Sequence, residues 1–471
     1  MTPAHTRSHI QSLPPEILST IFILTNIKPY KAPYKVREPY AGQLKLNGSL
    51  VGSVCRHWRN LSLNTPALWS KIILHLYQHP CSPAIRVLER LQMHLERSKA
   101  YPLSIFLNFN RGFGFDSCLE FLKSSQPEGN VAFRLLKTIF DHVGRIRHLS
   151  LTGAFDGFFT ILMPTFRDQF SNLIRLGLEG DIAPQGNRTN IANALSTFSN
   201  AQLHAIEVRE TKLTSEHCIP YSHLSSIFID KIDLTLFVTV LGANSSSLQY
   251  ARVVFVDSSL PSNISIPTLS NLQTLSITAY SFYQAQSLIN LFNQLTCPAL
   301  DTFSFWGEDP STFGPAISSF LARSPYLRCL YVYEHLFVVL KGIPSISILV
   351  LHLGSSGSRF IHDFATHLST YMSTLKELKI RAYRRGFEWA AFKGMVTAFW
   401  ECKKAPRLQS VYLSISKAAP PDDIVIWVRD MQIQGRVIRI YSDCDEYCYD
   451  IFKYRLPGIS YKKLGYEVAE E

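Results

Sequence analysis

The sequence lacks any run of about 18 consecutive apolar residues, the usual minimum for a membrane-spanning helix, so it predicts no transmembrane segment. The opening stretch, MTPAHTRSHIQSLPPEILSTIF, lacks the apolar core of a signal peptide, and we expect no secretion. The nine cysteines are odd in number and show no framework spacing, which favours free thiols in a reducing compartment. These features predict a cytoplasmic or nuclear protein without membrane contact.

Motifs of catalytic chemistry are missing as well. The patterns GxxxxGK[ST], GxSxG and HExxH do not occur, and RGFGFD lacks the strand–turn–helix context of a phosphate-binding loop. Cys444 and Cys448 lie close in sequence, but a zinc site needs about four ligands and no second pair is near. We therefore expect no enzymatic activity, no cofactor and no metal. The minor alternative is an enzyme with a dispersed site containing His148, Glu179 and His352.

The net charge of +11 suits an acidic partner or a nucleic acid. The basic residues form only short clusters, such as Arg384–Arg385 and Lys403–Lys404, without a basic stripe or a recognised nucleic-acid module. This distribution favours a protein partner over nucleic acid.

Two helices are predicted near the N-terminus. The segment SLPPEILSTIFILT places prolines at the first helical positions, where a missing N–H is harmless, and then repeats apolar residues one turn apart. A second helix is expected over about residues 50–61, with Val54 and Trp58 on its apolar face. The proline- and tyrosine-rich stretch at about 28–48 predicts an irregular loop. Two such helices cannot bury their apolar faces alone, so the next domain or a partner protein must cover them.

Three motifs in this region carry a family resemblance. LPPEIL, VCRHWR and LNTPALW follow one another in the order and spacing of the F-box, and the first 70 residues resemble F-box proteins of mushroom-forming fungi. The resemblance implies binding to a Skp-type adaptor and, through it, to a cullin. It also implies a set of adaptor-binding positions: Leu13, Pro14, Ile17, Leu18, Ile21, Val54, Cys55 and Trp58. The long loop between the helices departs from the usual motif, and Trp69 is expected to pack on the following domain.

Physical estimates agree with such an interface. Burial of one large apolar side chain contributes about 1.5–3 kcal/mol, so five or six of them can exceed the cost of association. Trp58 is the expected hot spot because tryptophan is enriched at the buried centres of interfaces.

The rest of the chain repeats one short pattern, apolar-x-x-apolar-x-apolar, roughly every 19 to 33 residues. Helix-like segments such as QAQSLINLFNQL and GPAISSFLARSP lie between the copies. Strand-then-helix units in series predict a parallel-sheet solenoid in which each unit buries its apolar face on its neighbours. The copies begin at Ile146, Leu173, Leu203, Leu224, Leu272, Leu300, Leu327, Ile346, Leu375 and Leu408, and looser copies begin at Leu248 and Gly435.

Residues between the repeated leucines are expected on the opposite, concave face of the sheet, because side chains alternate along a strand. Aromatic and basic side chains recur at these positions, a composition typical of binding hot spots. Loops or the C-terminal tail could instead cover them. The predicted target-binding set is Phe228, Trp306, Tyr331, Tyr333, Lys379, Arg381, Tyr412, Arg439 and Tyr441. The basic members hint at an acidic or phosphorylated target.

The sequence therefore predicts an α/β protein with three parts. A small helical F-box (1–70) precedes an irregular leucine-rich-repeat-like solenoid (71–443), with a parallel sheet on the concave face and helices on the convex face, and a cap or tail (444–471) follows. The expected function is that of a non-catalytic substrate receptor of a Skp–cullin–F-box ubiquitin ligase, which binds the adaptor and an unknown target protein. The alternative is a repeat scaffold for protein–protein interaction without ubiquitin transfer.

Overall fold

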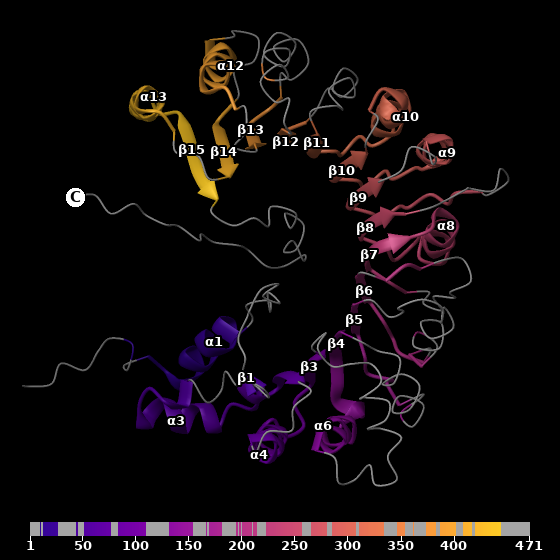
Figure 1. Cartoon of the computed structure of the whole chain (residues 1–471), viewed down its shortest axis with the longest axis vertical. Coiled ribbons are helices and arrows are strands. Elements are labelled where there is room, and N and C mark those ends of the chain that lie inside the picture. The colour runs from indigo at the N-terminus through magenta and orange to yellow at the C-terminus, as the bar shows by residue number, and fades with distance from the viewer. Residues whose placement is uncertain are drawn as a thin grey trace, which may run out of the picture.

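The computed structural model of the chain is organised around one long curved sheet (Figure 1). It describes residues 13–26, 44–45, 51–76, 83–109, 131–153, 169–180, 200–209, 211–213, 223–256, 265–279, 285–307, 310–333, 346–353, 374–382, 387–401, 408–416 and 420–443, and the single residues 10, 166, 195, 197, 198 and 361. The expected cap, residues 444–471, lies outside this set.

In the described part of the chain the strands form a 15-stranded sheet in sequence order. Each strand from β2 onward pairs in parallel with the next, and only β1 is antiparallel to its neighbour. The predicted parallel sheet is thereby confirmed. The strands are β1 Leu44–Lys45, β2 Lys71–Leu76, β3 Leu103–Phe109, β4 Ile146–Thr152, β5 Arg175–Glu179, β6 Ala205–Arg209, β7 Ser226–Ile232, β8 Tyr250–Phe255, β9 Thr274–Ala279, β10 Thr302–Gly307, β11 Cys329–Tyr333, β12 Ile348–Leu353, β13 Glu377–Ala382, β14 Ser410–Ser416 and β15 Val437–Asp443.

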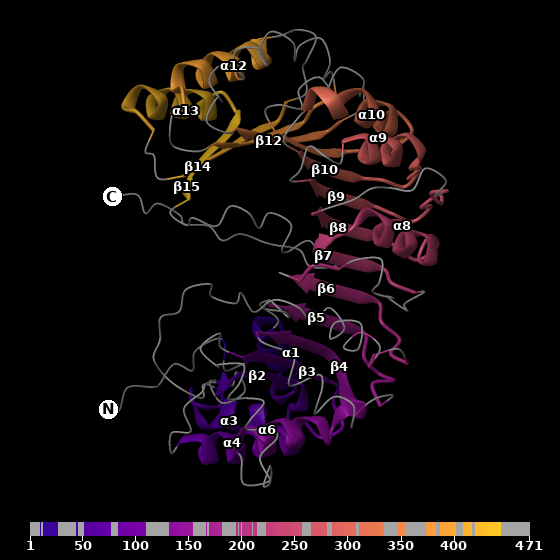
Figure 2. The same ribbon diagram turned by 45° about the vertical axis from the view of Figure 1, so that its right-hand side comes forward.

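Helices cover the outer face of this arc, and the strands line its inner, concave face (Figures 1 and 2). Arg323, just after α10, donates to three carbonyl oxygens at the end of α9, at 2.6–3.1 Å, and so caps its neighbour. The array helices are α4 Pro83–Arg97, α6 Val131–Phe140, α8 Leu234–Ala243, α9 Ala285–Gln294, α10 Pro310–Ala322, α12 Trp389–Glu401 and α13 Asp422–Ile433. The N-terminal helices are α1 Pro15–Asn26 and α3 Arg56–Leu63, followed by the short 3-10 helix η2 Pro66–Trp69.

The core lies between the sheet and the outer helices. Buried and half-buried residues alternate along strands such as β3 and β13, as the leucine pattern predicts. Phenylalanine rings continue the core from one repeat to the next: Phe170 lies between Phe140 and Phe198, with ring centroids 6.2 and 4.9 Å apart. No repeat is therefore buried without its neighbours.

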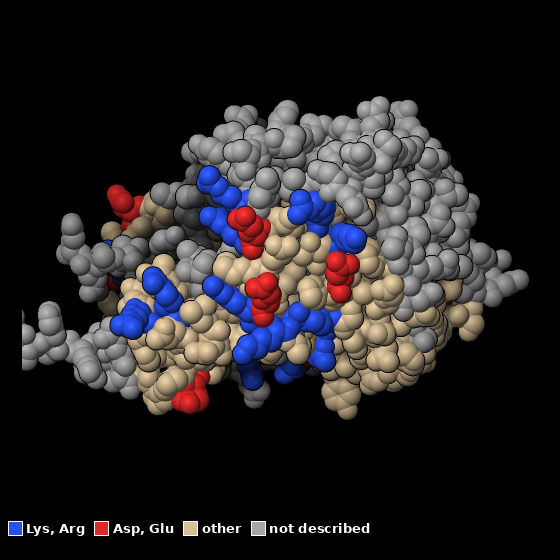
Figure 3. Space-filling view, turned by 90° about the horizontal axis from the view of Figure 1, so that it is seen from below, with Lys and Arg blue, Asp and Glu red and all other residues tan. Residues whose placement is uncertain are grey.

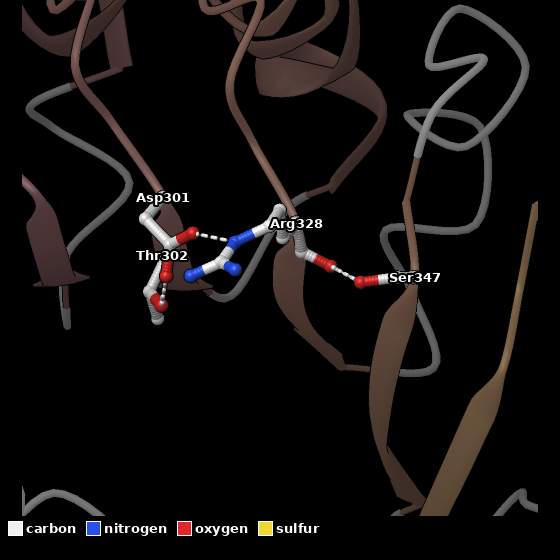
Figure 4. A network of polar contacts seen from close by, with 4 residues as sticks. All are labelled: Asp301, Thr302, Arg328 and Ser347. Atoms are coloured by element: carbon white, nitrogen blue, oxygen red, sulfur yellow. Dashed lines mark hydrogen bonds and ion pairs between the residues drawn. The ribbon is translucent and has the colours of Figure 1, made fainter.

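Polar contacts tie neighbouring repeats together where strands begin (Figure 4). Arg328, before β11, forms an ion pair with Asp301, before β10, and this bond raises the pKa of the arginine. The Ser347 hydroxyl donates to the carbonyl oxygen of Arg328 at 3.2 Å. These contacts support the strand register at an exposed edge, where an isolated ion pair contributes little.

The N-terminal unit differs from the prediction in two places. The helix predicted over about residues 50–61 is interrupted: Val51 and Gly52 are helical, but the chain then turns and Cys55 is extended (φ −157°, ψ 171°), so α3 begins at Arg56. The Cys55 thiol caps the new helix by accepting from the Trp58 amide at 3.4 Å. The predicted irregular loop also contributes strand β1, whose Leu44 pairs with Leu74.

Two glycines allow strands to stack closely at their ends. Gly153 and Gly180 follow β4 and β5 with φ of +114° and +135°. A Cβ at Gly153 would lie 2.0 Å from the Phe109 carbonyl oxygen. A side chain at this position therefore requires the backbone of the neighbouring strand to move.

We expect Gly153→Ala to lower the free energy of unfolding by about 1–3 kcal/mol, because positive-φ strain and a backbone clash act together. Gly144→Ala is the matched control, since no atom lies within 4 Å of the added methyl group. Urea unfolding followed by circular dichroism measures both. Equal midpoints for the two variants would contradict the close approach at Gly153.

Candidate functional site

The helices α1, α3 and η2 share a small core, here called the N-terminal cluster: Leu18, Phe22, Leu68 and Trp69. The Phe22 and Trp58 rings pack at 4.6 Å between centroids, which joins α1 to α3. The Ser19 and Thr65 hydroxyls are 3.3 Å apart and add a polar contact between α1 and the start of η2. These helices therefore form one packed unit.

Trp69 packs between this unit and the repeat array and joins the two. Its indole N–H donates to the Ser62 carbonyl oxygen at 2.6 Å, while its ring meets His94 of α4 edge-on at 4.6 Å. The Arg97 guanidinium lies over the same ring at 4.4 Å. Burial lowers the pKa of His94 to about 4, with the Arg97 charge acting in the same direction, so the ring is neutral near pH 7. The structure agrees with the expectation that Trp69 packs on the following domain.

Apolar side chains remain exposed on the outside of the N-terminal unit. Ile17 and Leu24 on α1 are 49% and 60% exposed, Val54 before α3 is 60% exposed, and Leu63 at the end of α3 is 37% exposed. We call these four residues the docking face. Scattered exposed leucines are ordinary, but four on one small unit with a rigid core behind them form a candidate binding surface.

The eight predicted adaptor-binding residues divide into three groups. Pro14, Ile17 and Val54 are exposed, whereas Leu13, Ile21, Cys55 and Trp58 are half-buried. Leu18 is fully buried, so its expected exposure is wrong: it packs behind the docking face. Trp58 packs mainly against Phe22, which makes it part of the supporting wall rather than a free hot spot.

Sequence reasoning missed Leu24 and Leu63. Leu24 stands seven residues after Ile17, a spacing that places both on one side of a helix and could have revealed it. The exposure of Leu63 depends on where α3 ends, and no local pattern marks it.

Strand register places the nine predicted target-binding residues on two rows across the concave face. The middle row carries Phe228, Tyr331, Lys379, Tyr412 and Arg439 on β7, β11, β13, β14 and β15. The outer row carries Trp306, Tyr333, Arg381 and Tyr441, with His352 between Tyr333 and Arg381. Residues that lie 20 to 30 positions apart in sequence therefore become neighbours.

Cations and rings alternate at the C-terminal end of the middle row. Tyr412 lies between Lys379 and Arg439, whose charged groups are 5.5 and 5.9 Å from the ring centroid. Lys379 also pairs with Glu377 at 2.9 Å. Lys379, Arg439 and the neighbouring Arg381 give this end an excess of positive charge over Glu377.

The outer row forms an aromatic stack. The Trp306 and Tyr333 rings meet edge-on at 6.1 Å, and the Tyr333 ring stacks on His352 at 4.7 Å. Burial lowers the pKa of His352 to about 3, and the charge of Arg381 acts in the same direction. The row therefore offers neutral aromatic surface next to a cation at neutral pH.

Two of the predicted aromatic residues are enclosed by neighbours to different degrees: Tyr331 is buried, whereas Phe228 is half-buried. Tyr331 is buried with Cys329 and Val350 in a small cluster on the concave face, so the expectation that it is exposed is wrong. Contact with Val350 on the next strand and with Cys329 on its own strand explains this burial. The Phe228 ring lies between the guanidinium groups of Arg209 and Arg252, at 4.7 and 4.6 Å. The side chain of Tyr441 lies outside the described part, although its backbone pairs with Ser414.

The structure brings together no catalytic group from the dispersed alternative. His148 is on β4, Glu179 is at the far end of β5, and His352 is on β12, eight strands from β4. At about 4.8 Å between strands, β4 and β12 are roughly 38 Å apart along the sheet. Within the described ranges, no cluster of three or more His, Cys, Asp or Glu could hold a metal ion, and no helix is long and apolar enough to cross a membrane.

Comparison with known proteins adds no relative. No protein-family model matches the chain, and no curated protein matches it. Its candidate functional surfaces are the docking face and the two concave rows.

We expect Trp306→Ala and Tyr333→Ala to leave the melting temperature within about 2 °C of the wild type, because both rings lie on the half-open concave face. Phe303→Ala, on the same strand as Trp306, is the control. It removes a buried ring from the opposite face and should cost about 3–5 kcal/mol and several degrees. A similar drop in melting temperature in all three variants would show that the Trp306 and Tyr333 rings are buried in the interior.

The His94 junction should weaken in acid. Because the folded pKa is about 4 and the unfolded value about 6.5, the unfolded chain binds the proton at the higher pH. The free energy of unfolding should therefore fall as pH drops from about 6.5 to about 4. In His94→Phe, which keeps a ring against Trp69 but cannot titrate, this part of the decrease should disappear.

Urea unfolding at pH 7.5, 5.5 and 4.5, followed by tryptophan fluorescence, measures this effect. The difference between the wild type and His94→Phe isolates His94 from other titrating groups. An identical pH dependence in both proteins would contradict the assignment.

Proposed function

We propose that this protein is a non-catalytic substrate receptor of a Skp–cullin–F-box ubiquitin ligase. In this proposal the docking face binds a Skp-type adaptor, and the concave rows hold a target protein. The observation that supports it most is the exposed apolar docking face on α1 and α3, backed by a packed core that the array holds in place. The order of the LPPEIL, VCRHWR and LNTPALW motifs supports the same assignment.

The docking face is suited to a helical partner. Ile17 and Leu24 lie on one side of α1, with Val54 exposed at the start of α3. Because each side chain is already about half buried, completing its burial would contribute roughly half of the 1.5–3 kcal/mol of full burial, or about 1 kcal/mol. Half-buried Ile21 and Leu13 could extend the contact with small side-chain movements. These apolar contacts would supply one part of the binding free energy, and polar contacts around them would have to supply the rest against the entropic cost of association.

A receptor must also hold its target at a defined place relative to the adaptor. The contacts of Trp69 with His94 and Arg97 join the N-terminal unit to α4, and η2 leads directly into β2. The docking face and the concave face thus belong to one continuous packed structure. Such rigidity raises the effective concentration of a bound target near the transfer machinery.

The concave rows offer a surface for that target. The Trp306–Tyr333–His352 stack gives aromatic contact, and Arg381, Lys379 and Arg439 supply positive charge beside it. A protein segment with an apolar side chain near an acidic or phosphorylated one fits this chemistry.

The double variant Ile17→Ala/Val54→Ala should bind a purified Skp-type adaptor about 10- to 100-fold more weakly, since each truncation removes roughly 1 kcal/mol or more of apolar contact. Its melting temperature should match the wild type because both side chains are about half exposed. Isothermal titration calorimetry measures the affinity.

The matched control is Ile426→Ala/Ile433→Ala on α13. These side chains are 58% and 84% exposed but lie at the other end of the array, so adaptor affinity should not change. Equal binding by the docking-face variant and the wild type would refute the proposed docking face. Adaptor binding without cullin association would favour the scaffold alternative.

A further inference from the structure

The net positive charge of the protein is confined to one end of the chain. Residues 1–153 contain 19 of the 47 Lys and Arg but only 8 of the 36 Asp and Glu, so they carry the whole net charge of +11. The other 318 residues are balanced, with 28 of each sign. The basic residues look dispersed when short stretches are compared, but the net positive charge lies entirely in residues 1–153.

Folding gathers this charge on one side. The described segments 51–76, 83–109 and 131–153 contain eleven Lys and Arg against three Asp and Glu. They include α3, α4 and α6, which lie together at the lower end of Figure 1. Seen from below, this end shows many Lys and Arg side chains and few acidic ones (Figure 3).

Arginines on α4 form a stripe. Arg86, Arg90 and Arg97 are spaced by four and seven residues, which places them within about 40° of one another around the helix. The Arg97 guanidinium lies over Trp69, so this side of α4 faces the N-terminal unit. The stripe therefore lies on α4 next to η2 at its Arg97 end.

The neighbouring α3 continues the positive surface. Arg56 and Arg59 are exposed there, and the Arg59 Nε donates to the Gly52 carbonyl oxygen at 3.0 Å, which steadies its side chain. No acidic residue occurs between positions 51 and 76. We call Arg56, Arg59, Arg86, Arg90 and Arg97 the basic rim, because exposed Val54 and Leu63 flank α3 on the same unit.

The placement of acids favours a protein partner over a nucleic acid. Glu89 and Glu96 are exposed on α4, one position before Arg90 and Arg97, and would repel a phosphate backbone that followed the helix. A protein surface can match such a mixed pattern locally. Apolar contacts surrounded by charge are also the usual composition of protein–protein interfaces.

We propose that the basic rim is the electrostatic border of the docking face and that the adaptor presents an acidic surface to it. This inference rests on the proposed function and specifies the chemistry of the adaptor. The exposed arginines of the rim, Arg56, Arg59, Arg86 and Arg90, would steer the encounter of the two proteins and accelerate association, and added salt would screen the effect. They contribute less to the lifetime of the complex, which depends on the buried apolar contacts.

The test measures association and dissociation rates of the full-length protein with a purified Skp-type adaptor at about 50 and 500 mM salt. The variant Arg86→Glu/Arg90→Glu should associate about tenfold or more slowly than the wild type at low salt, with a much smaller difference at high salt. Its dissociation rate should stay within about twofold. Both side chains are exposed, so the melting temperature should not change.

The control Lys376→Glu/Arg429→Glu reverses two exposed charges in the balanced part of the chain and should leave the association rate within about twofold of the wild type. A wild-type protein that does not bind the adaptor would overturn both the proposed function and this inference. Normal association by the basic-rim variant would overturn the inference alone. Normal adaptor kinetics with rim-dependent binding of a 20-base-pair DNA duplex would also overturn it and assign the face to nucleic acid.

Discussion

The structure depends on in-register pairing of parallel strands from β2 to β15. A single strand-and-helix repeat cannot bury its own apolar face, so each repeat is stable only against the next. Pairing also aligns every second residue of each strand into rows across the sheet. The core leucines form the rows that face the helices, and the residues between them form the concave rows. One backbone constraint therefore creates both the core and the candidate binding surface.

Much of this arrangement could be predicted from the sequence because it follows from local alternation. The apolar-x-x-apolar-x-apolar pattern indicates which residues enter the core, and the nine predicted target-binding residues do fall on two rows. Whether a row residue is open depends on side chains one strand away. Tyr331 is buried beside Val350 of the next strand and Cys329 of its own, and the half-buried ring of Phe228 lies between Arg209 and Arg252 of the two adjacent strands. No single repeat contains that information.

The N-terminal unit was harder to predict for a related reason. Apolar periodicity suggests one helix through residues 50–61, but the short cap at Cys55 restarts the helix and changes which side chains share a face. The exposure of Val54 and the burial of Leu18 both depend on how α1, α3 and η2 pack around Trp69. Motif order identifies the segment, whereas tertiary packing decides which residues of the motif reach the surface.

The two candidate surfaces use electrostatics in different ways. The concave cations lie against rings, as Lys379 and Arg439 do beside Tyr412, in a part of the chain whose charges balance. Their effect is local and orients a group that is already bound. The basic rim lies in the third of the chain that carries the entire net charge, so its field extends about a Debye length into solvent, roughly 8 Å at physiological salt. In the proposed function, this separation would keep an acidic target and an acidic adaptor on different surfaces, with long-range attraction at the docking end and selective contact at the concave face.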